Sequence, residues 1–533
     1  MTLCEINQFL VGLTHSTTAS RHIRIVGPHY LHIFEIHFLK SLEIRLPTII
    51  LTKVIVHNLL TENLAQRCVS WIARVWHKHL ITRITKSKSD MQDSFLRAYQ
   101  RQHLCIGIHI NAIPFLIEVL CDSIFIGRGA GPLAIAGLAI TFPLMNISSA
   151  FGAMLGVGSA AQTSVKMGEG NQQRALMIFG NMLRLDITIG LIITVIGLLF
   201  LDPILRLFGA SDATLPYAHD YMQIILAGNI VTHTFLGMND QLRATGNPRR
   251  AMTAQLIAVV VNIILDALFI FGFGWGMRGA ALATVLGQVC AWIFEFRFFL
   301  DKTNFVHFAR IGLKVRADII REILAIGLSP FCVNLCNSLI IIVINRTLMA
   351  QGGAEGDTYV GVYGIVNRCA MLVIMMVMGF GQGLQPIVGF NIGARLYDRV
   401  RGVVKFALGC AVTVMTIGYL LVFFFPGPLA SLFTTDADMV EKCIPALRII
   451  MCAFPFVGPQ MISMSFFQSS RKASIAILLS TSRQLVFLLP LLLILPPVMG
   501  VHGVWWSFPI SDIIAFLLAA FFLVREMRKL KNL

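Results

Sequence analysis

The stretch AMTAQLIAVVVNIILDALFIFGF, residues 251–273, decides the fold class. It carries a single charged side chain, Asp266. A helix needs roughly 20 apolar residues to cross the hydrocarbon core of a bilayer. A run of this length and composition therefore predicts a transmembrane helix rather than a buried helix of a soluble protein.

The composition of the whole chain agrees with this interpretation. Of the 533 residues, 56% are hydrophobic and 13% are charged, whereas an average soluble domain is roughly 25% charged. This balance argues against soluble domains, a disordered protein and a small disulfide scaffold. The 11 cysteines include no CxxC pair and are interpreted as packing residues. We predict an all-α polytopic membrane protein.

Apolar blocks alternate with short polar or Gly/Pro-rich connections from about residue 104 onward. Their number is even, so both ends of this core are expected on one side of the membrane. The twelve predicted spans are 104–126, 133–160, 175–200, 216–238, 251–273, 279–299, 322–349, 359–388, 403–425, 442–466, 473–495 and 503–524.

Positive charge is shared unevenly between the two sets of connections. One set carries clusters such as Arg249-Arg250 and Arg395–Lys405, whereas the opposite set carries Arg128, Arg206, Arg278 and almost nothing else. Because basic connections stay in the cytoplasm, both ends of the core are predicted to be cytoplasmic. The net charge of +16 is then explained without nucleic acid.

Residues 1–90 differ from the rest of the chain. They contain no run that could span a membrane, and no apolar core followed by a small-residue cleavage site. We interpret 1–90 as a leader outside the working protein, 91–310 as an N-terminal six-helix lobe and 311–533 as a C-terminal six-helix lobe. The alternative for 1–90 is a genuine basic extension on the membrane surface.

The second half of the core repeats landmarks of the first half at a shift of about 225 residues. Pro203-x-x-x-Leu207-Phe208 returns as Pro428-x-x-x-Leu432-Phe433, and Gly156-x-Gly158 returns as Gly381-x-Gly383. Duplicated bundles of this kind are typical of transporters whose substrate path lies between the halves. The sequence offers no filter motif for a channel and no Walker motif for an ATP-driven pump.

Asp266 is the most informative single residue. It lies deep in the span 251–273, where desolvation disfavours a charged carboxylate, so protonation could act as a switch. Asn262 lies one turn earlier on the same helix face, and Thr284 on the next span can supply a hydroxyl. The alternative is a structural carboxylate capped by these Asn and Thr side chains.

Seven stretches carry a family resemblance. They are Asp122-Ser-Ile-Phe-Ile-Gly127, Gly137-Leu-Ala-Ile-Thr-Phe-Pro143, Leu207-Phe-Gly-Ala-Ser211, Arg243-Ala-Thr-Gly-Asn-Pro248, Asn262-Ile-Ile-Leu-Asp266, Arg278-Gly-Ala-Ala-Leu-Ala-Thr284 and Gln382-Gly-Leu-Gln-Pro-Ile-Val-Gly-Phe-Asn391. Together they resemble the multidrug and toxic compound extrusion (MATE) family, in a bacterial DinF-like or MepA-like branch. The resemblance implies twelve transmembrane helices in two pseudo-symmetric six-helix lobes. It also implies export of amphipathic, often cationic, compounds driven by inward flow of H⁺ or Na⁺.

The resemblance further implies a cation-coupling site formed by Asp122, Asn262, Asp266 and Thr284. Two carboxylates with amide and hydroxyl oxygens suit either a proton or Na⁺, so the residues alone do not separate the two ions.

A candidate substrate cleft also follows from the resemblance. Its predicted residues are Gln382, Gln385, Asn345 and Arg346. Interhelical hydrogen bonding is the alternative role for each of them.

The first predicted span departs from the family pattern. Only Phe115–Cys121 separate Ala112-Ile-Pro114 from Asp122, which is shorter than usual, and Val119 stands where an Asn is usual. Pro114 could still act as a hinge by removing a backbone hydrogen bond. The atypical helix suggests a frameshift, a deletion or a misassigned start.

Three functions remain open at this point: a secondary antiporter, a lipid-linked precursor flippase of the same superfamily, and a non-transporting remnant with a damaged first helix. We expect no enzymatic activity, no cofactor and no bound metal beyond the coupling ion. The expected protein is a monomer in the bacterial inner membrane that meets lipid and small amphipathic substrates, and no nucleic acid.

Overall fold

The computed structural model describes residues 125–126, 132–434 and 436–532. The described residues all belong to one compact unit.

Parts of the sequence interpretation lie outside the described residues. These are the leader 1–90, nearly all of the first span 104–126, the hinge residue Pro114 and the coupling residue Asp122. Their roles stay predictions.

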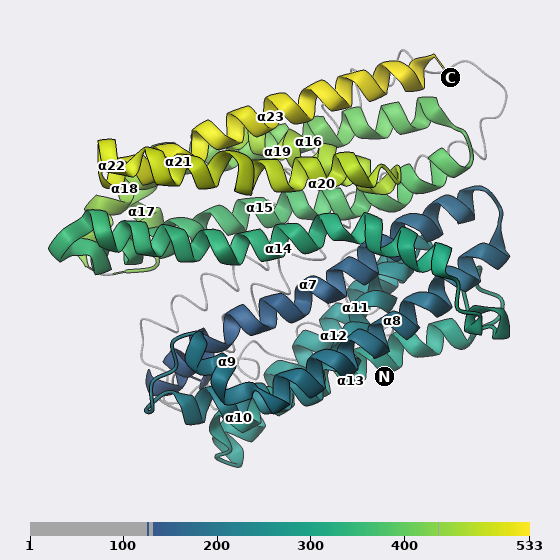
Figure 1. Ribbon diagram of the computed structural model, residues 1–533, viewed down its shortest axis with the longest axis horizontal. Coiled ribbons are helices and arrows are strands. Elements are labelled where there is room, and N and C mark those ends of the chain that lie inside the picture. Colours follow the sequence, from purple (N-terminus) through teal and green to yellow (C-terminus); the bar gives the residue numbers. More distant parts are fainter. Residues whose placement is uncertain (1–124, 127–131, 435, 533) are drawn as a thin grey trace, which may run out of the picture. The chain divides into compact units, whose positions relative to one another are not determined.

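Every regular element among the described residues is a helix. The N-terminal half, blue to teal in Figure 1, comprises α7 (Pro132–Gly168), α8 (Gln172–Leu199), α9 (Leu201–Leu207), α10 (Leu215–Ala227), α11 (Asn229–Ala244), α12 (Pro248–Asp266), η2 (Ala267–Gly272), α13 (Gly276–Leu300) and η3 (Arg310–Leu313). The C-terminal half, green to yellow, comprises α14 (Ala317–Gly352), η4 (Gly353–Glu355), α15 (Gly356–Gly393), α16 (Tyr397–Phe424), α17 (Pro426–Ser431), α18 (Ala437–Met451), α19 (Phe454–Ser469), α20 (Ala473–Thr481), η5 (Ser482–Leu488), α21 (Leu489–Ile494), α22 (Pro496–Met499) and α23 (Val501–Lys531).

The helices agree with the predicted spans. Within the described residues, 9 helical segments are long and apolar enough to cross a membrane, and the pair α18–α19, bent by 49°, makes a tenth. The predicted span 216–238 is formed by α10 and α11, of 13 and 16 residues, which meet at Gly228. Each is too short to cross alone. Buried His233, Asn239 and Gln241 explain why α11 is less apolar than the other helices.

The internal repeat extends to backbone conformation. Gly170 before α8 has a φ of 71°, and Arg395 before α16 has a φ of 58°. Gly246 before α12 has a φ of 80°, and Arg471 before α20 has a φ of 59°. Corresponding turns of the two halves therefore adopt the same left-handed conformation, although a side chain disfavours it at two of the four positions.

We predict that Arg395→Gly stabilises the chain by about 1 kcal/mol, because glycine adopts this backbone conformation without a Cβ clash. Thermal unfolding of the purified chain in detergent should show a higher Tm. The reciprocal control is Gly170→Arg, which should lower the Tm. Nothing lies within 4 Å of a Cβ at Gly170, so this change tests the backbone angle alone. An unchanged Tm in both variants would refute the strain argument.

Helices α7 and α15 meet in a symmetric contact between the halves. A Cβ placed on Gly168 would lie 2.0 Å from the backbone oxygen of Phe390, and a Cβ on Gly393 would lie 2.1 Å from that of Val165. The two glycines correspond in the repeat, and so do Val165 and Phe390. The halves therefore touch backbone to backbone at the C-terminal ends of α7 and α15.

This contact lies at the end of the helices that carries the basic connections. We call it the basic-loop end, defined by the connections 169–171, 245–247, 301–316, 394–396 and 470–472. Figure 1 shows α7 and α14 running side by side along the junction of the halves, and they are in extensive contact.

Ion pairs also join the halves at the basic-loop end. The Arg174 guanidinium on α8 lies 2.8 Å from a carboxylate oxygen of Asp318 on α14. Within the C-terminal half, Arg471 lies 2.8 Å from Glu322. These side chains are partly exposed, so each pair is expected to contribute at most about 1 kcal/mol.

Candidate functional site

The predicted coupling residues of the N-terminal half lie together between α12 and α13. Nδ2 of Asn262 donates a hydrogen bond to Oγ1 of Thr284 over 3.2 Å. Asp266 lies one turn after Asn262 on the same face of α12. All three residues are buried: Asn262 is 1% exposed, Thr284 8% and Asp266 0%. The fourth predicted residue, Asp122, lies outside the described residues.

Local helix geometry positions this site. The α-helical part of the span ends at Asp266, and the chain continues as the π-helix η2. Short π-helical turns are frequent at functional sites. The helices pack closely here, since a Cβ on Gly287 of α13 would lie 2.6 Å from the backbone oxygen of Ala258 on α12. This close packing holds Asn262 against α13.

The site offers oxygen atoms to a small cation. Oδ1 of Asn262 is buried and accepts no hydrogen bond from the described residues. Oγ1 of Thr284 donates to the backbone oxygen of Ala280 over 3.1 Å and accepts from Asn262, which leaves it one further lone pair. Together with the Asp266 carboxylate, these groups could hold a proton or Na⁺.

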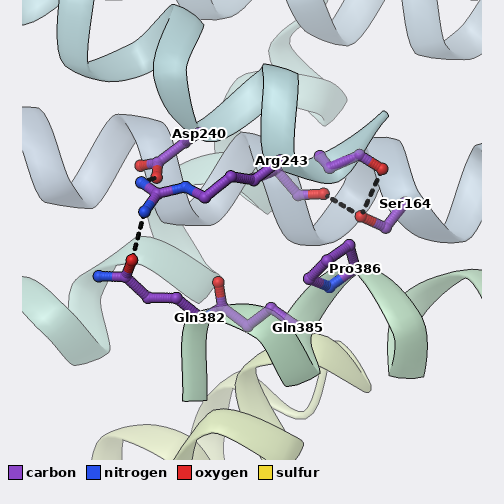
Figure 2. Close-up of a pocket in the computed structure, with 8 residues that line it drawn as sticks. Ser164, Asp240, Arg243, Gln382, Gln385 and Pro386 are labelled. Carbon is purple, nitrogen blue, oxygen red and sulfur yellow. Dashed lines mark hydrogen bonds and ion pairs between the residues drawn. The ribbon is translucent and has the colours of Figure 1, made fainter. Parts of the chain in front are cut away.

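A second polar site lies between the halves (Figure 2). It is a small cavity near the basic-loop end. Its lining comes from α7, α11 and α15: Ala160, Ser164, Asp240, Arg243, Ala244, Gln382, Gln385 and Pro386. The Arg243 guanidinium donates hydrogen bonds to the carboxylate of Asp240 on its own helix and to Oε1 of Gln382 on α15. Arg243 therefore links the two halves.

Two of the four predicted cleft residues line this cavity. Gln382 faces Arg243, and Nε2 of Gln385 donates to Oε1 of Gln468 over 2.9 Å. Nε2 of Gln468 donates in turn to Oγ of Ser329 over 3.0 Å, so a chain of hydrogen bonds runs from the cavity into the C-terminal half.

The other two predicted cleft residues do not line this cavity. Asn345 and Arg346 lie near the C-terminal end of α14, far along the helix from the basic-loop end. Arg346 is exposed and Asn345 is half-buried. Their part in substrate binding stays a prediction.

The C-terminal half also carries buried polar side chains beside a π-helix. Gln484 lies in the π-helix η5, and its Nε2 donates to Oδ1 of Asn337 on α14. Beside it, Arg483 lies 2.7 Å from the buried carboxylate of Asp512 on α23. A fixed guanidinium therefore compensates the carboxylate in this half.

Sequence reasoning missed the links made by Asp240, Arg243, Arg483 and Asp512. A signal was present, because each is a charged residue in or beside a predicted apolar span. The choice of partner, however, depends on tertiary packing, and 139 residues separate Arg243 from Gln382.

The MatE family model matches the chain twice, over residues 111–268 and 327–494. The chain belongs to the MatE family. A FAD transporter of Shewanella oneidensis is 26% identical over 400 residues, covering 74% of this chain and 87% of the relative. The multidrug export protein MepA of Staphylococcus aureus strain MSSA476 is 26% identical over 425 residues, covering 78% and 91%. A crystal structure of MATE in the bent conformation superposes with a TM-score of 0.76 at 24% identity, over 84% of this chain and 99% of that one.

The predicted family and fold class are therefore confirmed. This MatE chain is an all-α protein of the twelve-helix, two-lobe MatE architecture, and the described residues supply its second to twelfth spans. It is a multi-span membrane protein of a family of multidrug efflux transporters. The double match falls once in each half of the predicted repeat.

Proposed function

We propose that this MatE protein exports amphipathic, often cationic, small molecules in exchange for inward-moving H⁺ or Na⁺. The observation that carries the proposal is the separation of two polar sites. Asn262, Asp266 and Thr284 form a buried oxygen-rich site inside one half, whereas the cavity lined by Arg243 and Gln382 lies between the halves. An ion site inside one lobe and a path between lobes are what coupled alternating access requires.

The conformation supports an assignment of sides. The basic-loop end is closed by the glycine contacts, by the Arg174–Asp318 pair and by the bond from Arg243 to Gln382. Because basic connections favour the cytoplasm, we assign this end to the cytoplasmic face of a bacterial inner membrane. On this assignment both ends of the twelve-span core are cytoplasmic, and we infer an outward-facing state of a monomer.

Purified full-length chain in liposomes tests this proposal, with ethidium as the amphipathic cation. The liposomes are given either an acidic interior or a high internal Na⁺ concentration, and ethidium uptake is followed by its fluorescence. We expect one of the gradients to drive ethidium uptake well above that of protein-free liposomes. Movement of a fluorescent lipid-linked sugar without ethidium uptake would favour the flippase. Movement of neither probe would favour the non-transporting remnant.

A further inference from the structure

Three carboxylates come together around α11, away from the predicted coupling site; two of them are fully buried, and the third, Asp240, is 15% exposed. Asp186 comes from α8, Asp240 from α11 and Glu295 from α13. Asp186 and Glu295 are both 0% exposed. None of them belongs to the set of residues implied by the family resemblance.

Glycines on neighbouring helices make room for two of these carboxylates. A Cβ on Gly237 of α11 would lie 2.4 Å from Oδ2 of Asp186, and a Cβ on Gly156 of α7 would lie 2.2 Å from Oδ2 of Asp240. The third carboxylate is bound directly, since Oε1 of Glu295 accepts a hydrogen bond of 2.7 Å from Nδ2 of Asn239. Asp186 and Glu295 therefore each contact α11 within one turn of Asp240.

Several oxygens of the cluster lack partners. Both carboxylate oxygens of Asp186 and Oε2 of Glu295 are buried without a hydrogen bond from the described residues. Leaving ionised oxygens buried in this way is costly, and binding a proton removes the charge. The buried geometry thus favours neutral, proton-carrying carboxyl groups.

The charge balance within the cluster points the same way. Asp186 interacts with Asp240, and both Asp240 and Glu295 interact with Arg243. One guanidinium faces three carboxylates, so full ionisation would leave two negative charges uncompensated in the interior. Closely spaced carboxylates share protons rather than ionise together.

Among the described residues, the charged groups that act on the three acids are their own carboxylates and Arg243. Helices α7 and α15 contribute Gly156, Ser164, Gln382 and Gln385 to the same region, none of which titrates. On α8, Arg184 lies two residues from Asp186 and therefore on a different helix face.

His233 occupies a different part of α11. It lies two turns before Asp240 and contacts Oγ of Ser148 at 3.1 Å. It is therefore not a member of the cluster.

We propose that Asp186, Asp240 and Glu295 form a proton-binding site whose occupancy is linked to opening of the halves at the basic-loop end. The link is Arg243, which donates hydrogen bonds both to Asp240 of its own half and to Gln382 of the C-terminal half. Opening breaks the bond to Gln382 and exposes Asp240 to water, so the cluster releases a proton to that side. Closing buries the acids, and the cluster takes the proton up again. The closed state is then favoured at low pH and the open state at high pH.

The test measures the distance between spin labels across the basic-loop end as a function of pH. Labels are placed at Lys302→Cys and Lys405→Cys, both exposed, in a full-length chain whose native cysteines are replaced. Each linked proton changes the ratio of open to closed states about tenfold per pH unit. We expect Asp240→Asn and Glu295→Gln each to reduce this slope by up to one proton. The matched control Asp212→Asn, which is 89% exposed, should keep the parental slope.

A second variant separates proton binding by the acids from the hydrogen bond between Arg243 and Gln382. It also keeps the proposal testable if an acid variant fails to fold. Gln382→Ala keeps all three acids, so the slope should persist while the equilibrium shifts about tenfold toward the open state at every pH. The proposal is overturned if the parental chain has no pH response, or if the slope is the same in the parent and in both acid variants. It is also overturned if Asp266→Asn alone removes the whole response. The distance measurement needs no substrate. The proton-binding proposal can therefore fail or succeed independently of the export function.

Discussion

Asp266→Asn is expected to abolish ion-coupled export while leaving the protein folded in the membrane. The substitution keeps the size of a side chain that is 0% exposed, so packing against α13 should survive. It removes the only formal negative charge among the three described coupling residues. A charge-assisted interaction of about 1.5–3 kcal/mol corresponds to at least about a tenfold loss of ion-driven transport.

The measurement is ethidium efflux from cells, with membrane content followed by immunoblotting. Asp212→Asn is the matched control, because it is the same substitution at a side chain that is 89% exposed. Thr284→Ala should give a smaller loss, since it removes a neutral hydrogen-bond partner of Asn262. Full efflux by Asp266→Asn at normal membrane content would contradict the assigned role.

Gly158→Leu is expected to prevent closure at the basic-loop end and thereby stop transport. A Cβ on Gly158 of α7 would lie 2.2 Å from the backbone oxygen of Ile323 on α14. That oxygen belongs to a helix backbone and cannot rotate away, so the two helices must separate. Each half should still fold, because the clash arises only between the halves.

Accessibility of the inter-half cavity reports this change. Ser164→Cys places a thiol at a cavity position that is 1% exposed. Labelling with a membrane-impermeant maleimide from the basic-loop side should be at least about tenfold faster when Gly158→Leu is also present, if closure normally stabilises the buried state by about 1.4 kcal/mol or more. The control is Gly402→Leu, because nothing lies within 4 Å of a Cβ at Gly402. Unchanged labelling together with normal transport would show that the glycine contact is not needed for closure.

Hydropathy could predict the fold because each span must satisfy its backbone internally and face lipid. The same reasoning could not place the break at Gly228 or the π-helices η2 and η5, since these depend on packing between neighbouring helices. The turns at Arg395 and Arg471 are a different case. The repeat aligns them with Gly170 and Gly246, so their left-handed conformation could have been predicted from the sequence.

The candidate sites also differ in how far the sequence predicts them. Asn262 and Asp266 share one helix face, so their proximity follows from helical periodicity. Arg243, Asp240 and Gln382 come together only when α7, α11 and α15 pack. A charge in an apolar segment signals that a partner must exist, but the sequence does not say which residue it is.

Substrate and ion are expected to move in opposite directions through one coupled cycle. The direct measurement uses an ethidium gradient, in place of an ion gradient, as the driving force. Liposomes that contain the full-length chain are loaded with ethidium and diluted into ethidium-free buffer of the same pH and Na⁺ concentration. Internal pH and internal Na⁺ are followed with indicator dyes as ethidium leaves. Coupled exchange predicts that ethidium efflux drives H⁺ or Na⁺ inward, and that Asp266→Asn abolishes this ion movement. Ethidium efflux through the protein with no ion movement, or ion movement undiminished in Asp266→Asn, would contradict it.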